Sequence, residues 1–154
     1  MKINYYADEG VKIPLFRKQI LNKWIQQMIL EYGFTLGEIT YKFTTDEGIL
    51  EINKLFLNHD YYTDILTFDA RENIESKEII GDILISLERV NDNANSMNLP
   101  FEEELHRVLI HGILHLCGLK DKTEEEEQQM RIAEDRALYV LHNLVGDNTL
   151  LKKS

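Results

Sequence analysis

The sequence predicts an α+β fold, in which a small mixed sheet of about four strands packs with helices and the central helix carries a pair of histidines. Short segments alternate apolar and polar residues, as half-buried strands do, and longer segments carry apolar residues at helical spacing. The two kinds of segment interleave irregularly, which is typical of the α+β class. No repeat, linker or low-complexity tract divides the 154 residues, so we expect one domain spanning residues 1–154.

The first half of the chain predicts two strands, each followed by a helix. Proline favours the first turn of a helix and glycine the position after its last turn, so Pro14 and Gly33 set the limits of the first helix. A Thr or Asp before the next apolar stripe is typical of a helix N-cap. In order, the predicted elements are a strand at 2–6, a helix from Pro14 to about Tyr32, a strand at 38–44 and a helix from Thr45 or Asp46 to about Leu57.

The second half predicts two strands and three helices. Thr123 with Glu126 three residues later forms a capping box, and glycines at the ends of apolar stripes are typical helix stops. In order, the predicted elements are a loop at 58–62, a strand at 63–68, a polar loop at 71–77, a strand at 81–86, a helix that Ser86 caps and that runs toward Met97, a helix that follows Pro100 and ends at Gly118, and a helix from Thr123 to Gly146.

The net charge of −10 argues against a protein that binds nucleic acid by broad neutralisation of phosphates, and we expect no binding to DNA. Seven of the acidic residues lie at two predicted helix starts, 102–104 and 124–127, where they interact favourably with the helix dipole. This local placement leaves a more limited contact with RNA possible.

Apolar runs and cysteine usage predict where in the cell the protein is found. No window approaches about 18 uninterrupted apolar residues and the first residues do not resemble a signal peptide, so we expect no membrane contact and a cytoplasmic protein. The single cysteine, Cys117, agrees with a reducing compartment. Its position on the helix lies off the face of the two histidines, which predicts a thiol in the core.

The two histidines, His111 and His115, are four residues apart in the fourth predicted helix. Residues at this spacing stack on one helix face with about 5–6 Å between their Cβ atoms, so both imidazoles can reach one metal ion. Gly118 ends the helix, and the chain can then fold back so that Asp121 offers a carboxylate to the same point. Three protein ligands plus a water are typical of a catalytic zinc site, so the sequence predicts one Zn2+ per chain on His111, His115 and Asp121.

Gly112 follows the first histidine directly. Glycine inside a helix costs about 1 kcal/mol relative to alanine, so this position predicts a packing or functional reason. Glycine also cannot act as the general base that His-Glu-x-x-His metallopeptidases carry there. A histidine pair at this spacing also occurs in helices that bind no metal, and the prediction therefore depends on the residues around the pair.

Other polar side chains are open to two interpretations. His59, in the predicted 58–62 loop, could approach the site, although a solvated histidine is the simpler interpretation. We interpret His106 and His142 as structural or exposed, and no side chain stands out as a general acid. Five basic residues are candidate phosphate contacts or ordinary surface charges: Lys54, Arg71, Arg107, Lys120 and Lys122.

Three blocks of sequence occur together in this chain. They are Thr63-Asp64-Ile65-Leu66-Thr67-Phe68 after Asn53 and Asp60, Gly81-Asp82-Ile83-Leu84-Ile85-Ser86, and His111-Gly112-x-Leu114-His115-Leu116-x-Gly118. With these blocks the chain resembles the YbeY family of single-strand-specific metallo-endoribonucleases. The resemblance implies a zinc-dependent hydrolase domain that acts on single-stranded RNA, with rRNA or a ribosomal subunit as partner. It further implies roles in maturation of the 16S rRNA 3′ end and in ribosome quality control.

Three positions depart from the pattern that the resemblance implies. Family members usually carry a histidine where this chain has Asp121, a tyrosine where it has Leu119, and an arginine that helps bind phosphate where it has Leu57. Aspartate is an acceptable zinc ligand at about 2.0–2.2 Å, so we expect two histidines and one carboxylate around the metal. Cleavage of RNA without the arginine requires another cation.

Three functions are compatible with the sequence. The first is the metal-dependent endoribonuclease, with a zinc-bound water as the expected nucleophile. The second is a zinc metallopeptidase or another zinc hydrolase, against which Gly112 argues. The third is a zinc-stabilised ribosome assembly factor without catalysis, which the acidic composition and Leu57 favour.

Overall fold

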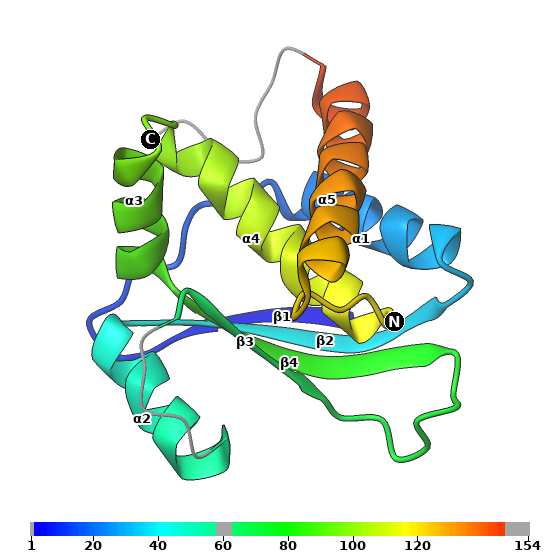
Figure 1. The fold of residues 1–154 in the computed structure, drawn as a ribbon, viewed down its shortest axis with the longest axis horizontal. Coiled ribbons are helices and arrows are strands. Elements are labelled where there is room, and N and C mark those ends of the chain that lie inside the picture. Colours follow the sequence, from blue (N-terminus) through cyan, green and yellow to red (C-terminus); the bar gives the residue numbers. More distant parts are fainter. Residues whose placement is uncertain (1, 58–62, 147–154) are drawn as a thin grey trace.

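The computed structural model of the chain describes residues 2–57 and 63–146. In these residues four strands form one mixed sheet and five helices pack around it (Figure 1), as the predicted α+β class requires. The elements are β1 (Lys2–Ala7), α1 (Lys18–Glu31), β2 (Thr35–Thr44), α2 (Asp46–Leu57), β3 (Ile65–Asp69), β4 (Glu78–Ser86), α3 (Leu87–Ser96), α4 (Phe101–Leu116) and α5 (Glu124–Val145).

The strand order is β1-β2-β4-β3. β1 runs parallel to β2, β2 parallel to β4, and β3 antiparallel to β4. The connection between the parallel strands β1 and β2 contains α1, because parallel neighbours need a crossover long enough for a helix. The central strands β2 and β4 are therefore paired on both sides, and the edges are the short strands β1 and β3.

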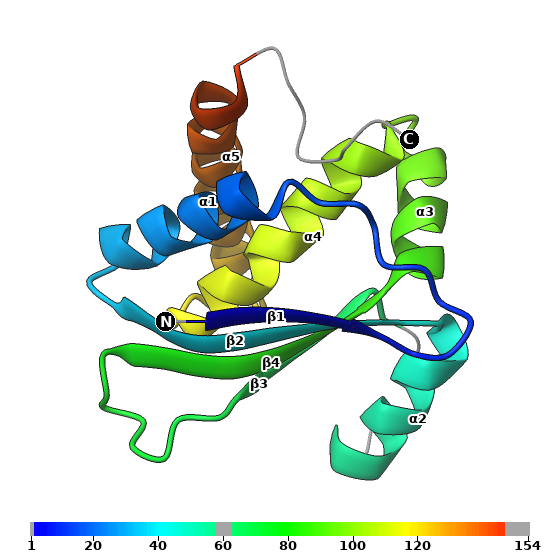
Figure 2. The same cartoon turned by 180° about the vertical axis from the view of Figure 1, so that it is seen from behind.

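The helices divide unequally between the two faces of the sheet. α1 and α4 lie on one face with α5 packed outside them, and α2 lies on the other face (Figures 1 and 2). Alternate residues of β2 and β4 point toward α4 and are fully buried: Ile39, Tyr41, Phe43, Ile83 and Ile85. The helix with the two histidines is thus held between the sheet and α5.

Gly112 allows α4 to lie close to the sheet. A Cβ atom at this position would stand 2.9 Å from Ile83 Cδ1 and 3.1 Å from Ile65 Cδ1, which is tighter than ordinary van der Waals contact. The packing reason that the sequence predicted for this glycine is therefore a contact with β3 and β4. A larger side chain here would push the helix, and with it His111, away from the sheet.

Most helix limits agree with the predicted capping residues. Ser86 Oγ accepts a hydrogen bond from Arg89 N at the start of α3, and Thr123 and Glu126 form the predicted capping box at the start of α5. Gly118 follows α4 with a φ of 100°, the left-handed conformation that glycine adopts without strain. The reversal after α4 is the one that the sequence predicted.

Some predicted limits were wrong. α1 begins at Lys18, four residues after Pro14, because the intervening Phe16 is buried with its ring centroid 5.7 Å from Tyr5 and 5.8 Å from Phe43. β2 and β4 begin three residues earlier than predicted, and β3 begins two residues later and ends one later. Pairing of the first residues of β2 and β4 explains the longer strands. The predicted 58–62 loop lies outside the described residues.

A membrane span requires a helix of sufficient length and apolarity. None of the described helices is both long and apolar enough to cross a membrane.

Tyr41 joins the sheet to α4, and its removal tests how firmly that helix is held. The buried Tyr41 hydroxyl donates a hydrogen bond to the Leu109 carbonyl oxygen at 2.8 Å. Tyr41→Phe removes only the hydroxyl, and we expect the free energy of unfolding in urea to fall by about 1–2 kcal/mol. Tyr139→Phe makes the same change on an exposed part of α5 and should alter the free energy of unfolding by less than about 0.5 kcal/mol. Equal effects of the two substitutions would contradict a role for this bond.

Candidate metal centre

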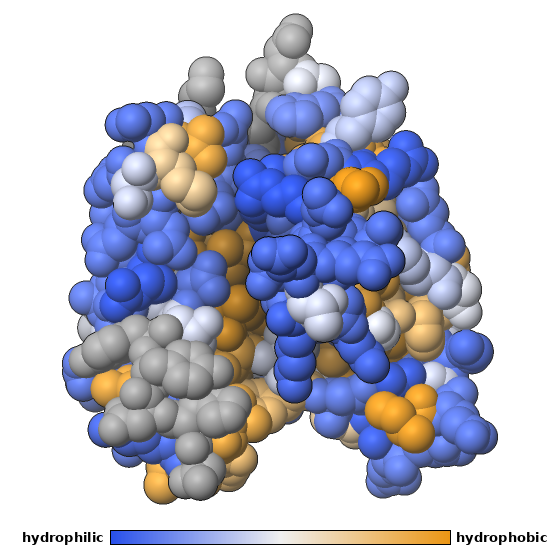
Figure 3. Space-filling model, in the orientation of Figure 1, coloured by the Kyte–Doolittle hydropathy of each residue, from blue (hydrophilic) through white to orange (hydrophobic). Residues whose placement is uncertain are grey.

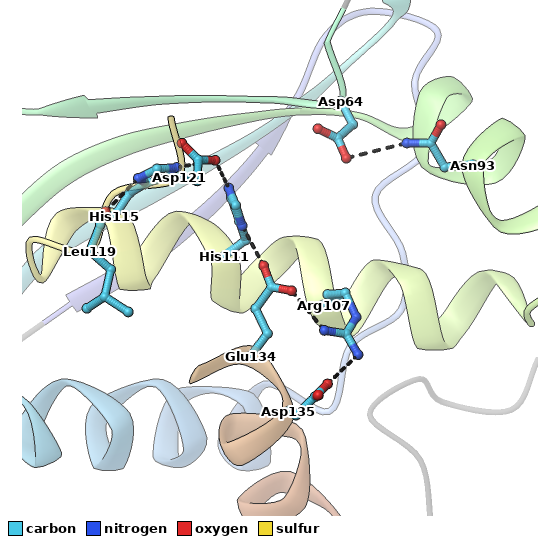
Figure 4. A network of polar contacts seen from close by, with 9 residues as sticks. All are labelled: Asp64, Asn93, Arg107, His111, His115, Leu119, Asp121, Glu134 and Asp135. Carbon is cyan, nitrogen blue, oxygen red and sulfur yellow. Dashed lines mark hydrogen bonds and ion pairs between the residues drawn. The ribbon is translucent and has the colours of Figure 1, made fainter. Parts of the chain in front are cut away.

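His111, His115 and Asp121 converge on one point, as the sequence predicted. The Nε2 atoms of His111 and His115 each lie 3.2 Å from the same oxygen, Asp121 Oδ2 (Figure 4). The two rings are nearly perpendicular, with an interplanar angle of 87° and centroids 4.6 Å apart. Among the described residues, these three form a group whose ligand atoms all lie within 4.8 Å of one another.

These distances fit a small tetrahedral cation. Zinc bonds to histidine nitrogen and carboxylate oxygen at about 2.0–2.2 Å, so neighbouring ligand atoms in a tetrahedral site are about 3.3–3.5 Å apart. The observed 3.2 Å between each Nε2 and Asp121 Oδ2 is close to this separation. The donor set of two imidazoles and one carboxylate is also one that zinc accepts, and it leaves a coordination position for a water.

The other nitrogen of each imidazole is held by a hydrogen bond. His111 Nδ1 lies 2.6 Å from Glu134 Oε2, and His115 Nδ1 lies 3.0 Å from the Leu119 carbonyl oxygen. Both acceptors lack a proton to donate, so each Nδ1 carries the hydrogen and each Nε2 is directed at Asp121. Such contacts orient metal-ligating histidines and select their tautomer. Because residue 119 contributes its backbone carbonyl, this contact does not depend on leucine or tyrosine at that position.

Glu134 is a buried carboxylate whose two oxygens both have partners. Its side chain is 7% exposed, and its Oε1 accepts a hydrogen bond from Arg107 Nη1 at 2.8 Å. Burial raises the pKa of Glu134, but His111 and Arg107 lower it more, so the net shift is downward and the group stays ionised. Burial lowers the pKa of His111, and Glu134, Asp121 and Asp64 outweigh it and raise the pKa.

The three converging residues line a cavity of about 920 Å³. In the space-filling view the cavity is a hollow with an apolar floor and hydrophilic sides (Figure 3). Of the other carboxyl groups that line it, Asp64 follows the 58–62 segment and Glu104 lies on α4. Burial raises the pKa of both groups. The cavity therefore combines converging ligand atoms with weakly acidic side chains and space for a large substrate.

The predicted phosphate contacts separate into two groups. Arg107 and Lys122 line the cavity, but Arg107 is engaged by Glu134 and, at 2.8 Å, by Asp135. Lys54, Arg71 and Lys120 do not line it, and Arg71 is paired with Asp69. Leu57 lines the cavity with an aliphatic side chain.

Two further predictions concern Cys117 and His59. Cys117 is buried in the core, where burial raises its thiol pKa to about 12, so the predicted core thiol is confirmed. His59 lies outside the described residues.

Glu134 was missed in the sequence. It lies 23 residues from His111, and only the packing of α5 on α4 brings the two side chains together. One signal was available, since Glu134 falls four residues after Met130 and three before Ala137, on the buried stripe of α5. An acidic residue on an apolar stripe predicts a buried partner.

The remaining histidines are structural or exposed, as predicted. His142 is exposed. The His106 side chain is only 12% exposed, and its Nε2, 3.5 Å from Glu102 Oε1, has no close hydrogen-bond partner among the described residues. Burial, assisted by His142, lowers the pKa of His106 to about 4. His106 is therefore neutral at pH 7, and its contact with Glu102 is not an ion pair.

The pKa of His106 predicts a pH-dependent stability. Between pH about 6.5, the usual histidine pKa, and about 4, the unfolded chain binds a proton that the folded chain does not. The free energy of unfolding should therefore fall as pH falls through this window, by on the order of 2 kcal/mol from His106 alone. Urea unfolding of His106→Gln and of the exposed control His142→Gln, from pH 7 to 4, measures how much of the pH dependence comes from His106. A His106→Gln profile as steep as that of the control would contradict it.

Comparison with known proteins identifies the family. A solution structure from Thermotoga maritima is similar in fold alone, with a TM-score of 0.61 and 22% identity over 92% of this chain and 89% of that chain. A family model described as Endoribonuclease YbeY matches residues 6–142.

Several relatives carry the name Endoribonuclease YbeY. One from Porphyromonas gingivalis is 53% identical over 150 residues, which cover 97% of both chains. One from Bacteroides fragilis is 49% identical over 133 residues, 86% of this chain and 94% of that protein. One from Christiangramia forsetii is 45% identical over 92% of this chain and 95% of that protein. With a family match over most of its length and relatives of this identity, the chain belongs to the YbeY family.

Proposed function

We propose that this chain is a metal-dependent endoribonuclease that hydrolyses single-stranded RNA in rRNA processing. The names of its relatives support an endoribonuclease. The observation that carries the proposal is the convergence of His111, His115 and Asp121 in a cavity large enough for a nucleotide strand. The proposal includes maturation of the 16S rRNA 3′ end and ribosome quality control, in the cytoplasm, by residues 1–154 acting as one domain.

We further propose that the metal is one Zn2+ per chain, held by His111, His115 and Asp121. Two neutral imidazoles and a carboxylate are a donor set that zinc prefers. When bound, the metal supplies Lewis acidity at the scissile phosphate and lowers the pKa of a coordinated water toward neutrality.

The side chains around the centre have separate tasks in this proposal. Glu134 and the Leu119 carbonyl hold the two imidazoles with Nε2 directed at the ligand point. Arg107 balances the charge of Glu134, so the buried carboxylate stays available to His111. The apolar floor excludes water from part of the substrate, which strengthens the electrostatic contacts made beside it.

The two other functions that the sequence left open are less well supported. A peptidase with ligands on this helix needs a general base at Gly112, and Glu134 is already engaged by His111 and Arg107. An assembly factor without catalysis needs no cavity beside the ligands. The experiment below separates all three functions.

Loss of the metal or of one ligand should abolish RNA cleavage. We expect zinc-loaded protein to cut an end-labelled single-stranded RNA, and His115→Ala or a chelator to lower the rate at least about 100-fold, because each removes the reactive centre. Re-addition of zinc should restore the chelated wild type but not the variant. His142→Ala, an exposed histidine on α5, is the matched control and should cleave normally.

Equal residual cleavage by wild type and His115→Ala would indicate a contaminating nuclease and overturn the proposal. Binding of RNA or ribosomes without turnover would support the assembly factor, and cleavage of unstructured peptide without cleavage of RNA would support the peptidase. Circular dichroism of each variant verifies that the fold is retained.

Glu134 should strengthen metal binding through His111. Glu134→Gln replaces the charged acceptor of the His111 Nδ1 hydrogen bond by a neutral amide. We expect zinc affinity to fall by about 10- to 100-fold, the usual effect of removing such a partner. Competition with a chromophoric chelator measures the affinity. Asp135→Asn removes the neighbouring partner of Arg107, which does not contact His111, and should change it less than about twofold. Unchanged affinity in Glu134→Gln would contradict this role.

A further inference from the structure

Three cations line the cavity among the residues that the structure describes: Arg107, Lys122 and Arg131. Arg107 is engaged in two ion pairs of 2.8 Å, with Glu134 and Asp135. A guanidinium held in this way is not free to turn toward a substrate. The positive charges that remain for a substrate are therefore Lys122, which follows Asp121 in the sequence, and Arg131 on α5.

Arg131 is on the cavity side of α5, where its charge attracts that of Glu104 without a direct ion pair. It is exposed, and within the described part of the chain its guanidinium makes no hydrogen bond or ion pair. It lies three residues before Glu134, and residues at this spacing share one face of a helix. The side chain is therefore carried on the face of α5 that meets α4, without a salt bridge to restrain it.

Arg131 lines the cavity but is not one of the three residues that converge on the ligand point. Leu99, Arg107 and Arg131 also line a second groove, of about 450 Å³, between α4 and α5. Arg131 thus stands where the two hollows meet. A strand that enters the cavity and continues into this groove must pass its guanidinium.

Resting on the endoribonuclease function proposed above, we propose that Arg131 binds a backbone phosphate of the RNA strand that flanks the phosphate at the metal centre. Five carboxylates line the cavity against three cations, so an anionic strand needs positive charge beyond the metal. A guanidinium offers two parallel N–H donors to one phosphate, a stronger contact than a single point charge. Leu57, at the end of α2, lines the cavity but adds no charge to it.

A flanking contact predicts a specific change in binding. With zinc-loaded full-length protein at about 100 mM salt, we expect Arg131→Gln to raise the Kd for a fluorescent single-stranded RNA, and the KM for its cleavage, about five- to tenfold. The kcat should change less than about twofold, since a flanking contact is the same in the ground and transition states. Fluorescence anisotropy on a probe shown by gel to stay intact measures the Kd.

The salt dependence identifies a phosphate contact directly. One phosphate contact fewer should reduce the slope of log Kd against log salt concentration by about 0.7 for a single strand. Arg131→Lys should keep this slope and recover only part of the affinity, because lysine retains the charge but not the paired donors. Arg136→Gln removes the same charge from the same helix at a residue paired with Glu31, and should leave both Kd and slope unchanged.

Each other outcome counts against a part of the proposal. Equal Kd and slope in wild type and Arg131→Gln would overturn the assignment of Arg131, whatever the cleavage result. Equal changes in Arg131→Gln and Arg136→Gln would also overturn it, by showing an effect of net charge alone. RNA binding by the wild type without cleavage would refute the proposed nuclease, with Arg131 still judged by the binding series. Absence of RNA binding by the wild type would refute both.

Discussion

The hydrogen bond between His111 Nδ1 and the buried carboxylate of Glu134 links the packing of the molecule to the candidate centre. A buried carboxylate is costly unless charged or polar partners satisfy both its oxygens. Glu134 meets this requirement with His111 on one oxygen and Arg107 on the other, both from α4. One of the contacts between α5 and α4 is thus the contact that orients His111. The same imidazole therefore contacts α5 through Nδ1 and Asp121 through Nε2.

A second constraint sets the height of α4 above the sheet. Gly112 permits close approach to Ile83, and the Tyr41 hydroxyl binds the Leu109 carbonyl from the same side. The sheet therefore fixes the position of one side of α4. The helix α5 fixes the position of another side of α4. His111 and His115 occupy the part of the helix that neither covers completely, where the cavity opens. This arrangement holds the helix firmly and leaves its two histidines accessible from the cavity.

The sequence predicted the features that depend on neighbours along the chain. The candidate ligands His111, His115 and Asp121 lie within eleven residues joined by one helix turn and one glycine reversal, so their convergence follows from local spacing. The packing reason for Gly112 and the capping box at Thr123 followed from equally local chemistry. Features that depend on tertiary contact were not predicted. α1 begins later than predicted because Phe16, just before it, is buried in the core. The lengths of the strands depend on pairing with their neighbours and not on the alternation of apolar residues.

The same distinction explains which side chains of the site were not found. Glu134 and Arg131 come from a helix that follows the motif, and no local pattern connects them with His111. Arg107 was recognised as a cation, but the structure is needed to show that Glu134 and Asp135 already engage it. A charge count cannot separate an engaged guanidinium from a free one, because both contribute equally to it.

The acidic character of the chain bears on the form of RNA that the cavity suits. With a net charge of −10 and few cations in the cavity, the proposed enzyme neutralises few phosphates, so the general attraction that holds basic RNA-binding proteins to any RNA is weak here. Affinity must then come from the metal centre, from isolated contacts such as the one proposed for Arg131, and from the aliphatic floor. Bases can reach that floor only when they are unstacked and unpaired. A duplex presents its phosphates outward and keeps its bases inside, so it would meet the carboxylates of the cavity without gaining the apolar contact. We therefore expect the proposed enzyme to prefer single strands because of the shape and charge of the cavity, without reading of the base sequence.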